Sequence, residues 1–68
     1  MLNNEIKTCI NEFAKNNGIS LKVVLDIMNC SLLSLNKERK ALYKKVEKIL
    51  KNKIISVNEL INRIKLWM

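Results

Sequence analysis

Apolar residues recur every three or four positions along most of the chain, which is the spacing of one face of an α-helix. The first such segment covers residues 2–17 and stops at Asn17-Gly18, a typical helix C-cap. Ser20 can cap a second helix, LKVVLDIMN, which is apolar on almost all sides and is therefore expected at the centre of the fold. A strand is the competing interpretation of LKVVLDI, but no second strand candidate could pair with it.

The next segment, CSLLSLN (residues 30–36), contains three possible helix caps, so we expect a brief helical turn or a loop fixed to the core by leucines. The caps are Ser31, Ser34 and Asn36, and the leucines are Leu32, Leu33 and Leu35. A strongly amphipathic helix is predicted over residues 37–52. Its apolar face holds Leu42, Val46, Ile49 and Leu50, and its opposite face holds Lys37, Lys40, Lys44, Lys48 and Lys51.

A last helix is predicted after SVNE (residues 56–59), which has the pattern of a capping box. Its apolar face contains Val57, Leu60, Ile61, Ile64 and Trp67. The chain has 68 residues, no proline, one glycine and 4% aromatic residues, which disfavours a small β barrel. We therefore predict one all-α domain over residues 1–68, a compact bundle of four to five short helices.

The positive charge of the chain is concentrated in one helix. Residues 37–53 contain eight Lys or Arg and two Glu, a net charge of +6 out of the total +7. Lysine is also a common way to solvate the outer face of a helix, and under this interpretation the lysines have no binding partner. An ordinary solvated face, however, mixes charges at four-residue spacing, and here only Glu47 with Lys51 fits that pattern. An anionic partner is the alternative that the charge favours.

Other functional classes are disfavoured. The chain has no histidine, and Cys9 and Cys30 occupy apolar helical positions, so we expect buried reduced thiols, no metal, no cofactor and no enzyme. It has no apolar run of about 18 residues and no signal peptide, which predicts a cytoplasmic protein. Binding to a membrane surface is not expected either, because such helices usually display several Trp or Phe and this chain has one of each.

Three segments in order, NNGIS (residues 16–20), MNCS (28–31) and LNKERKALYKKVEKIL (35–50), give the chain a resemblance to the phage-repressor or Cro-like (XRE-type) helix-turn-helix domains. The resemblance covers roughly residues 6–50. It implies that LKVVLDIMN is the scaffold helix and that the recognition element starts at Ser31. Lys37, Arg39 and Lys40 would take the basic positions that contact the DNA backbone.

This chain departs from the family pattern in two places. Asn29 replaces the glycine of the turn, which is tolerable because asparagine visits left-handed conformations. The recognition segment is about one helical turn shorter than usual and reads Leu-Leu-Ser, which offers little to base edges. A second register, with Ala14, Gly18, Val24 and Ile27 at the characteristic positions, would make LKVVLDIMN the recognition helix. We disfavour it because Val23 and Asp26 would face DNA.

The sequence favours two alternative functions. The first is a small DNA-binding transcriptional regulator of a mobile element such as a phage or plasmid, acting on double-stranded DNA as a homodimer. Its phosphate contacts would come from Ser31, Ser34, Lys37, Arg39, Lys40, Lys44, Lys45 and Lys48. The second is a protein-binding modulator, an antirepressor or inhibitor of a protein such as a repressor, with Leu32, Leu33 and Trp67 as interface anchors. Trp67 is the candidate dimer contact in the first case, unless it folds back on the core of its own chain.

Overall fold

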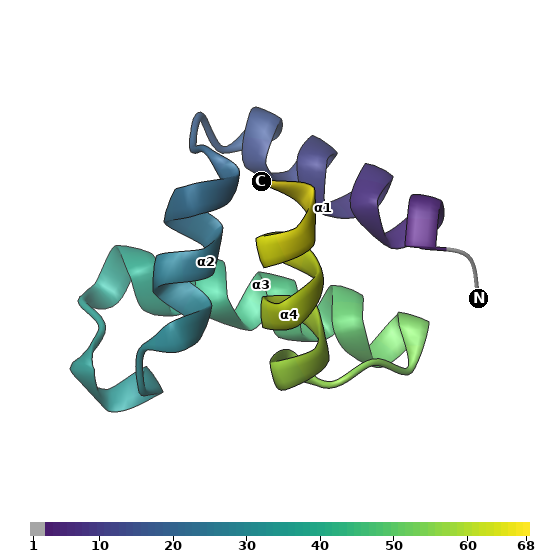
Figure 1. Ribbon diagram of the computed structural model, residues 1–68. Helices are drawn as coiled ribbons and strands as arrows, with labels where there is room; N and C mark the ends of the chain where they lie inside the picture. The colour runs from purple at the N-terminus through teal and green to yellow at the C-terminus, as the bar shows by residue number, and fades with distance from the viewer. Residues whose placement is uncertain (1–2) are drawn as a thin grey trace.

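The computed structural model describes residues 3–68, with side chains from residue 5. It contains four α-helices, α1 (Asn3–Asn16), α2 (Leu21–Asn29), α3 (Lys37–Lys53) and α4 (Val57–Trp67), and a 3₁₀ turn, η1 (Leu32–Ser34), between α2 and α3 (Figure 1). No strand occurs in this part of the chain, so the predicted all-α class is confirmed and LKVVLDI is helical. Leu2, predicted on the first apolar face, lies outside the described residues.

The predicted end of α1 at Gly18 is present as a Schellman motif. Gly18 adopts the left-handed conformation, with φ of 65°. The Ile19 amide donates to the Ala14 carbonyl oxygen at 2.9 Å, and the Gly18 amide donates to that of Lys15 at 3.2 Å. These bonds satisfy carbonyl groups that the end of the helix would otherwise leave without a donor.

The end of α3 has the same motif with a different residue. The Ile55 amide donates to the Leu50 carbonyl oxygen at 3.1 Å, and Ile54 occupies the left-handed position with φ 56° and ψ 50°. A β-branched residue rarely adopts this conformation because its Cβ crowds the backbone. Ile54 is 91% exposed, so contacts with the core do not compensate for that strain.

The predicted N-caps of α2 and α4 are present, and the capping box of α4 is half formed. The Ser20 hydroxyl oxygen accepts from the Val23 amide at 3.2 Å, and the Ser56 hydroxyl oxygen accepts from the Glu59 amide at 3.1 Å. The Glu59 carboxylate does not return to Ser56 as a capping box requires. It accepts instead from the Arg63 guanidinium at 3.1 Å, one turn further along α4.

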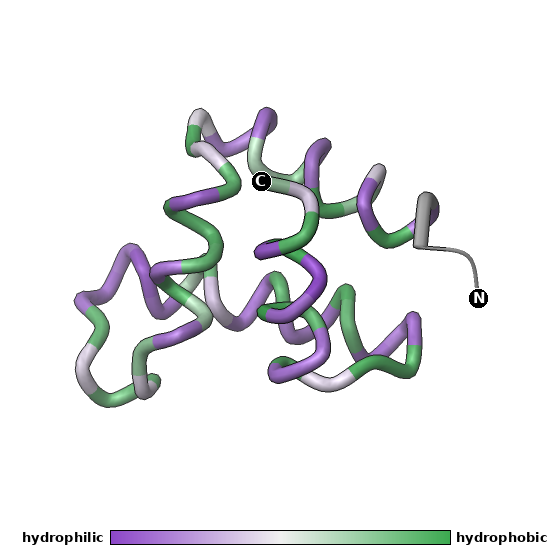
Figure 2. The backbone as a smooth tube through the Cα atoms, in the orientation of Figure 1, coloured by the Kyte–Doolittle hydropathy of each residue, from purple (hydrophilic) through white to green (hydrophobic). Residues whose placement is uncertain are grey.

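The helices enclose an apolar core. In Figure 1, α1 crosses one end of α2 and α4, and α3 lies behind these two helices, while α2 contacts each of the other three. Apolar and polar residues alternate along every helix (Figure 2), as an amphipathic bundle requires. The radius of gyration, 11.0 Å, matches the value of about 11 Å expected for a compact chain of this length. The buried residues are Ile6, Ile10, Phe13, Ala14, Val24, Ile27, Met28, Leu35, Val46, Leu50, Leu60, Ile61 and Ile64.

Three predicted core positions need correction. Cys30 is exposed and Cys9 is only half-buried, so the expectation of two buried thiols is wrong for Cys30 and holds only in part for Cys9. Cys30 follows the last residue of α2, where the chain has already left the helical face that packs inward. Leu33 does not fix the turn to the core, since it is 89% exposed, whereas Leu35 is buried and Leu32 packs against the core.

Candidate nucleic-acid interface

The basic residues are carried by α3, whose position is fixed at its start and along its inner face. The Asn36 side-chain oxygen accepts from the Arg39 amide at 2.9 Å and caps the helix, as the sequence predicted. Val46 and Leu50 are buried, and Leu42 packs against the same core. Because this face is held by the rest of the molecule, the opposite face of α3 is presented outward.

Five lysines follow one another along that outward face, and we call them the lysine ridge: Lys37, Lys40, Lys44, Lys48 and Lys51. Four of them are exposed, and Lys40 is half-buried. By helix geometry the five Cα atoms fall within an arc of about 80° and extend over about 21 Å of the helix axis. The ridge is therefore a narrow line of positive charge rather than a diffuse basic surface.

Two other residues predicted to contact phosphates do not belong to this line. Arg39 and Lys45 are both exposed. By helix geometry, however, they lie about 140° and 100° around the axis from the centre of the ridge. A single DNA backbone running along the ridge would not meet either of them without bending around the helix.

Among the residues with described side chains, no carboxylate forms a salt bridge with the ridge. Among residues 5–68, the one salt bridge joins Arg63 to Glu59 on α4, with 3.1 Å between Nη2 and Oε1. The Glu47–Lys51 pair that the sequence suggested is not formed. The like charges of the ridge therefore repel one another, and water and salt screen that repulsion over a distance of about 8 Å.

The turn before α3 uses its polar groups internally. The Ser34 hydroxyl donates to the Ser31 carbonyl oxygen at 2.8 Å, and the Ser31 side chain caps no helix. Both serines are exposed. Ser34 would have to give up its bond to Ser31 before its hydroxyl could donate to a phosphate.

The two kinds of predicted interface anchor differ in exposure. Leu33 projects from η1 and is almost fully exposed, while Leu32 beside it packs partly against the core. Trp67 also packs against the core and is half-buried, so part of its ring surface is already covered by its own chain. Leu66, next to it, is 84% exposed.

The segment that the helix-turn-helix resemblance assigns to recognition forms only the three-residue turn η1. An α-helix there would reach into a major groove, but a single 3₁₀ turn does not.

In the second register α2 would be the recognition helix. Val24 and Ile27 are buried, and the exposed residues of α2 are Lys22, Asp26 and Asn29. That strip has no net charge and favours DNA less than the ridge does.

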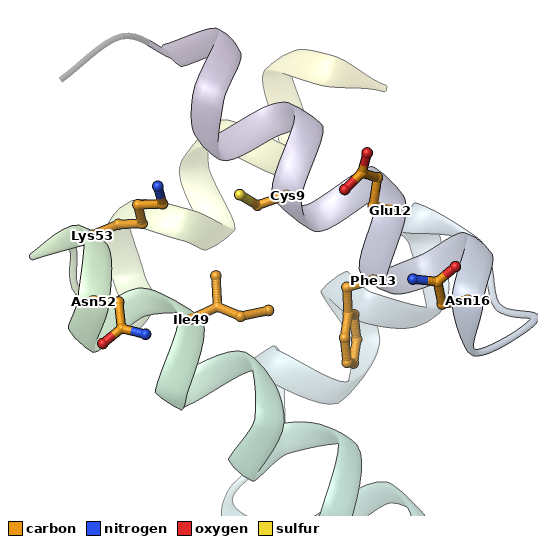
Figure 3. Close-up of a pocket in the computed structure, with 7 residues that line it drawn as sticks. All are labelled: Cys9, Glu12, Phe13, Asn16, Ile49, Asn52 and Lys53. Atoms are coloured by element: carbon orange, nitrogen blue, oxygen red, sulfur yellow. The ribbon is translucent and has the colours of Figure 1, made fainter.

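A groove that the sequence did not predict lies between α1 and the C-terminal end of α3 (Figure 3). It consists of two adjoining cavities of about 400 and 370 Å³, and both are lined by Cys9 and Lys53. Phe13 and Ile49 add apolar surface, and Glu5 and Glu12 stand along the α1 side. These residues come from helices about forty positions apart, so no local pattern could have indicated the groove.

Comparison of the chain with protein-family models, with curated proteins and with solved structures gave no match. Within residues 3–68, no helix combines the length and the apolar character needed to cross a bilayer. In the same part of the chain, no three His, Cys, Asp or Glu residues are grouped so that they could hold a metal ion.

Proposed function

We propose that this chain binds double-stranded DNA through the lysine ridge, as a small transcriptional regulator that contacts phosphates more than bases. The single observation that carries this proposal is the ridge itself, five lysines in line on the outer face of α3 with no carboxylate partner among residues 5–68. A duplex of the same length, about 21 Å, carries about twelve phosphate charges. Binding would relieve the repulsion between the lysines and release counterions from the DNA.

The chemistry of the ridge favours positioning over base recognition. Lysine acts as a point charge on phosphate, whereas base edges are usually read by Arg, Asn or Gln in a groove. None of those three residue types lies on the ridge, and the polar groups of η1 are partly engaged within the chain. We therefore expect similar affinity for duplexes of different sequence.

A salt titration tests the proposal. With four or five phosphate contacts, the logarithm of the affinity should fall against the logarithm of salt concentration with a slope of about −4. This slope corresponds to a loss of about 250-fold between 50 and 200 mM salt. Fluorescence anisotropy with a labelled duplex of about 20 base pairs measures it directly.

A triple variant, Lys37→Ala, Lys44→Ala and Lys48→Ala, removes three exposed members of the ridge. The slope should become shallower by about 2.7, because each lost contact contributes about 0.9. The matched control changes Lys7, Lys22 and Lys65 to alanine, three exposed lysines on the other helices, and lowers the net charge equally. If both triple variants lose the same affinity and slope, net charge explains the binding and the ridge does not.

One observation favours the second function, a modulator that binds another protein. Leu33 is 89% exposed at the tip of a turn that is held by its neighbours Leu32 and Leu35. An exposed apolar side chain on a turn that is anchored in this way suits a protein interface. In that case wild-type protein would bind no DNA at low salt, would copurify in fixed ratio with another protein, and would lose that partner on Leu33→Ala substitution.

A further inference from the structure

The groove between α1 and α3 combines an apolar floor with an acidic side. Cys9, Phe13 and Ile49 supply the floor, and Figure 3 shows the Cys9 and Ile49 side chains directed into the space between the two helices. Glu5 and Glu12 lie on one side of α1, two turns or about 10.5 Å apart. Neither carboxylate forms a salt bridge among residues 5–68. An apolar side chain flanked by positive charge would complement this groove.

The chain itself displays such a side chain beside the groove. Of the large hydrophobic residues that the structure describes, Ile54 is the most exposed, at 91%. It directly follows Lys53, which lines both cavities. Lys53 therefore gives it a positively charged neighbour. Ile54 also holds a left-handed conformation that glycine would adopt more easily. Strain kept at an exposed position is a reason to look for a contact made by that side chain.

We propose that two copies of this chain associate through this surface, each inserting Ile54 into the groove of the other. The arrangement is self-complementary, as a two-fold dimer requires, because the projecting residue and the groove lie side by side on one molecule. Lys53 of one copy would approach Glu5 and Glu12 of the other. The occupant is a second copy because it presents an apolar residue with a basic neighbour to an apolar floor with acidic neighbours.

Dimerisation of this kind leaves the lysine ridge uncovered. By helix geometry the groove residues of α3, which are Ile49, Asn52 and Lys53, lie about 130° around the axis from the centre of the ridge. The association therefore neither needs DNA nor competes with it, and its failure would leave the proposed DNA binding untouched. A stable interface usually buries about 800 Å² per partner, whereas this chain exposes 4729 Å² in all. One isoleucine cannot cover so much, so we expect a weak dimer with a Kd of about 100 μM.

Sedimentation equilibrium in 0.15 M salt tests the dimer, with Ile54→Gly as the main variant. Glycine preserves the left-handed turn, so the fold persists while the projecting side chain is lost. We expect the Kd of self-association to rise by about tenfold or more. The matched control is Leu66→Ala, which shortens another highly exposed apolar side chain, on α4, and should leave the Kd unchanged.

The two free cysteines provide an independent measurement. Cys9 lies in the groove, whereas Cys30 is exposed at the end of α2. As protein concentration rises through the Kd, alkylation of Cys9 should slow while alkylation of Cys30 proceeds at a constant rate. Glu12→Lys should weaken the dimer from the groove side, and Asp26→Lys, the same charge change on α2, should not.

Three results would overturn the proposal. The first is a monomer at every concentration up to about 1 mM, well above the expected Kd. The second is an equal loss of association in Ile54→Gly and Leu66→Ala. The third is alkylation of Cys9 that does not depend on protein concentration, which would place any self-association elsewhere on the molecule.

Discussion

Substituting Ile54 by glycine should stabilise the folded monomer, although it removes a large apolar side chain. Ile54 ends α3 in the left-handed conformation, with φ 56°, and is 91% exposed. The side chain therefore contributes little burial to the fold, while its Cβ strains the backbone. Glycine relieves that strain and keeps both hydrogen bonds of the Schellman motif.

The size of the effect follows from three contributions. A non-glycine residue in the left-handed region costs about 2 kcal/mol, which glycine recovers. Glycine lowers the stability by about 0.75 kcal/mol, because it gives the unfolded chain greater backbone freedom. The lost burial is about 0.2 kcal/mol, a tenth of the value for a fully buried isoleucine. The free energy of unfolding should therefore rise by about 1 kcal/mol, which raises Tm by about 4–8 °C in a domain of this size.

Thermal unfolding followed by circular dichroism measures the change, at a protein concentration of about 5 μM so that self-association does not contribute. The chain supplies a reciprocal control, because Gly18 ends α1 with the same motif and φ 65°. A Cβ at position 18 would meet no atom within 4 Å. Gly18→Ala should therefore cost about 1 kcal/mol through backbone strain alone. An unchanged or lower Tm for Ile54→Gly would refute the reasoning, as would a neutral Gly18→Ala.

The remaining predictions concern a helix cap and the core. Ser56→Ala should lower the free energy of unfolding by about 1 kcal/mol because it removes the acceptor for the Glu59 amide. Ser31→Ala should change it little, since that side chain caps no helix, and an equal loss from both would contradict the cap assignment. Leu60→Ala should cost about 3 kcal/mol, enough to leave much of this small chain unfolded at 25 °C, because Leu60 is fully buried. Leu66→Ala should be nearly neutral by the same denaturant titration.

The helices were predictable from the sequence because their signals are local. The three- and four-residue spacing of apolar residues places a helix within one or two positions of its true limits for each of α1 to α4. Ser20, Asn36 and Ser56 act as caps through bonds to amides three residues away. The positive line on α3 was predictable for the same reason, since residues on one helix have fixed relative positions once the helix forms.

The end of α3 shows where local signals fail. No glycine or asparagine marks position 54, and the left-handed turn occurs there because the chain must reverse direction to bring α4 against α2. The Glu59 carboxylate could accept either from the Ser56 amide at the N-cap or from Arg63 one turn later. In the structure it accepts from Arg63. At Ile54 the tertiary path of the chain therefore overrides the local preference of the residue.

The sequence by itself determined the four helices, their caps and the line of charge on α3. Only the tertiary structure decided which leucine of η1 is exposed, that Cys30 lies outside the core, and that α1 and α3 form a groove with Ile54 beside it. The physical reason is the range of the interactions involved. Hydrogen bonds and side-chain spacing within a helix depend on neighbours up to four residues away, whereas burial depends on surfaces that distant segments bring together.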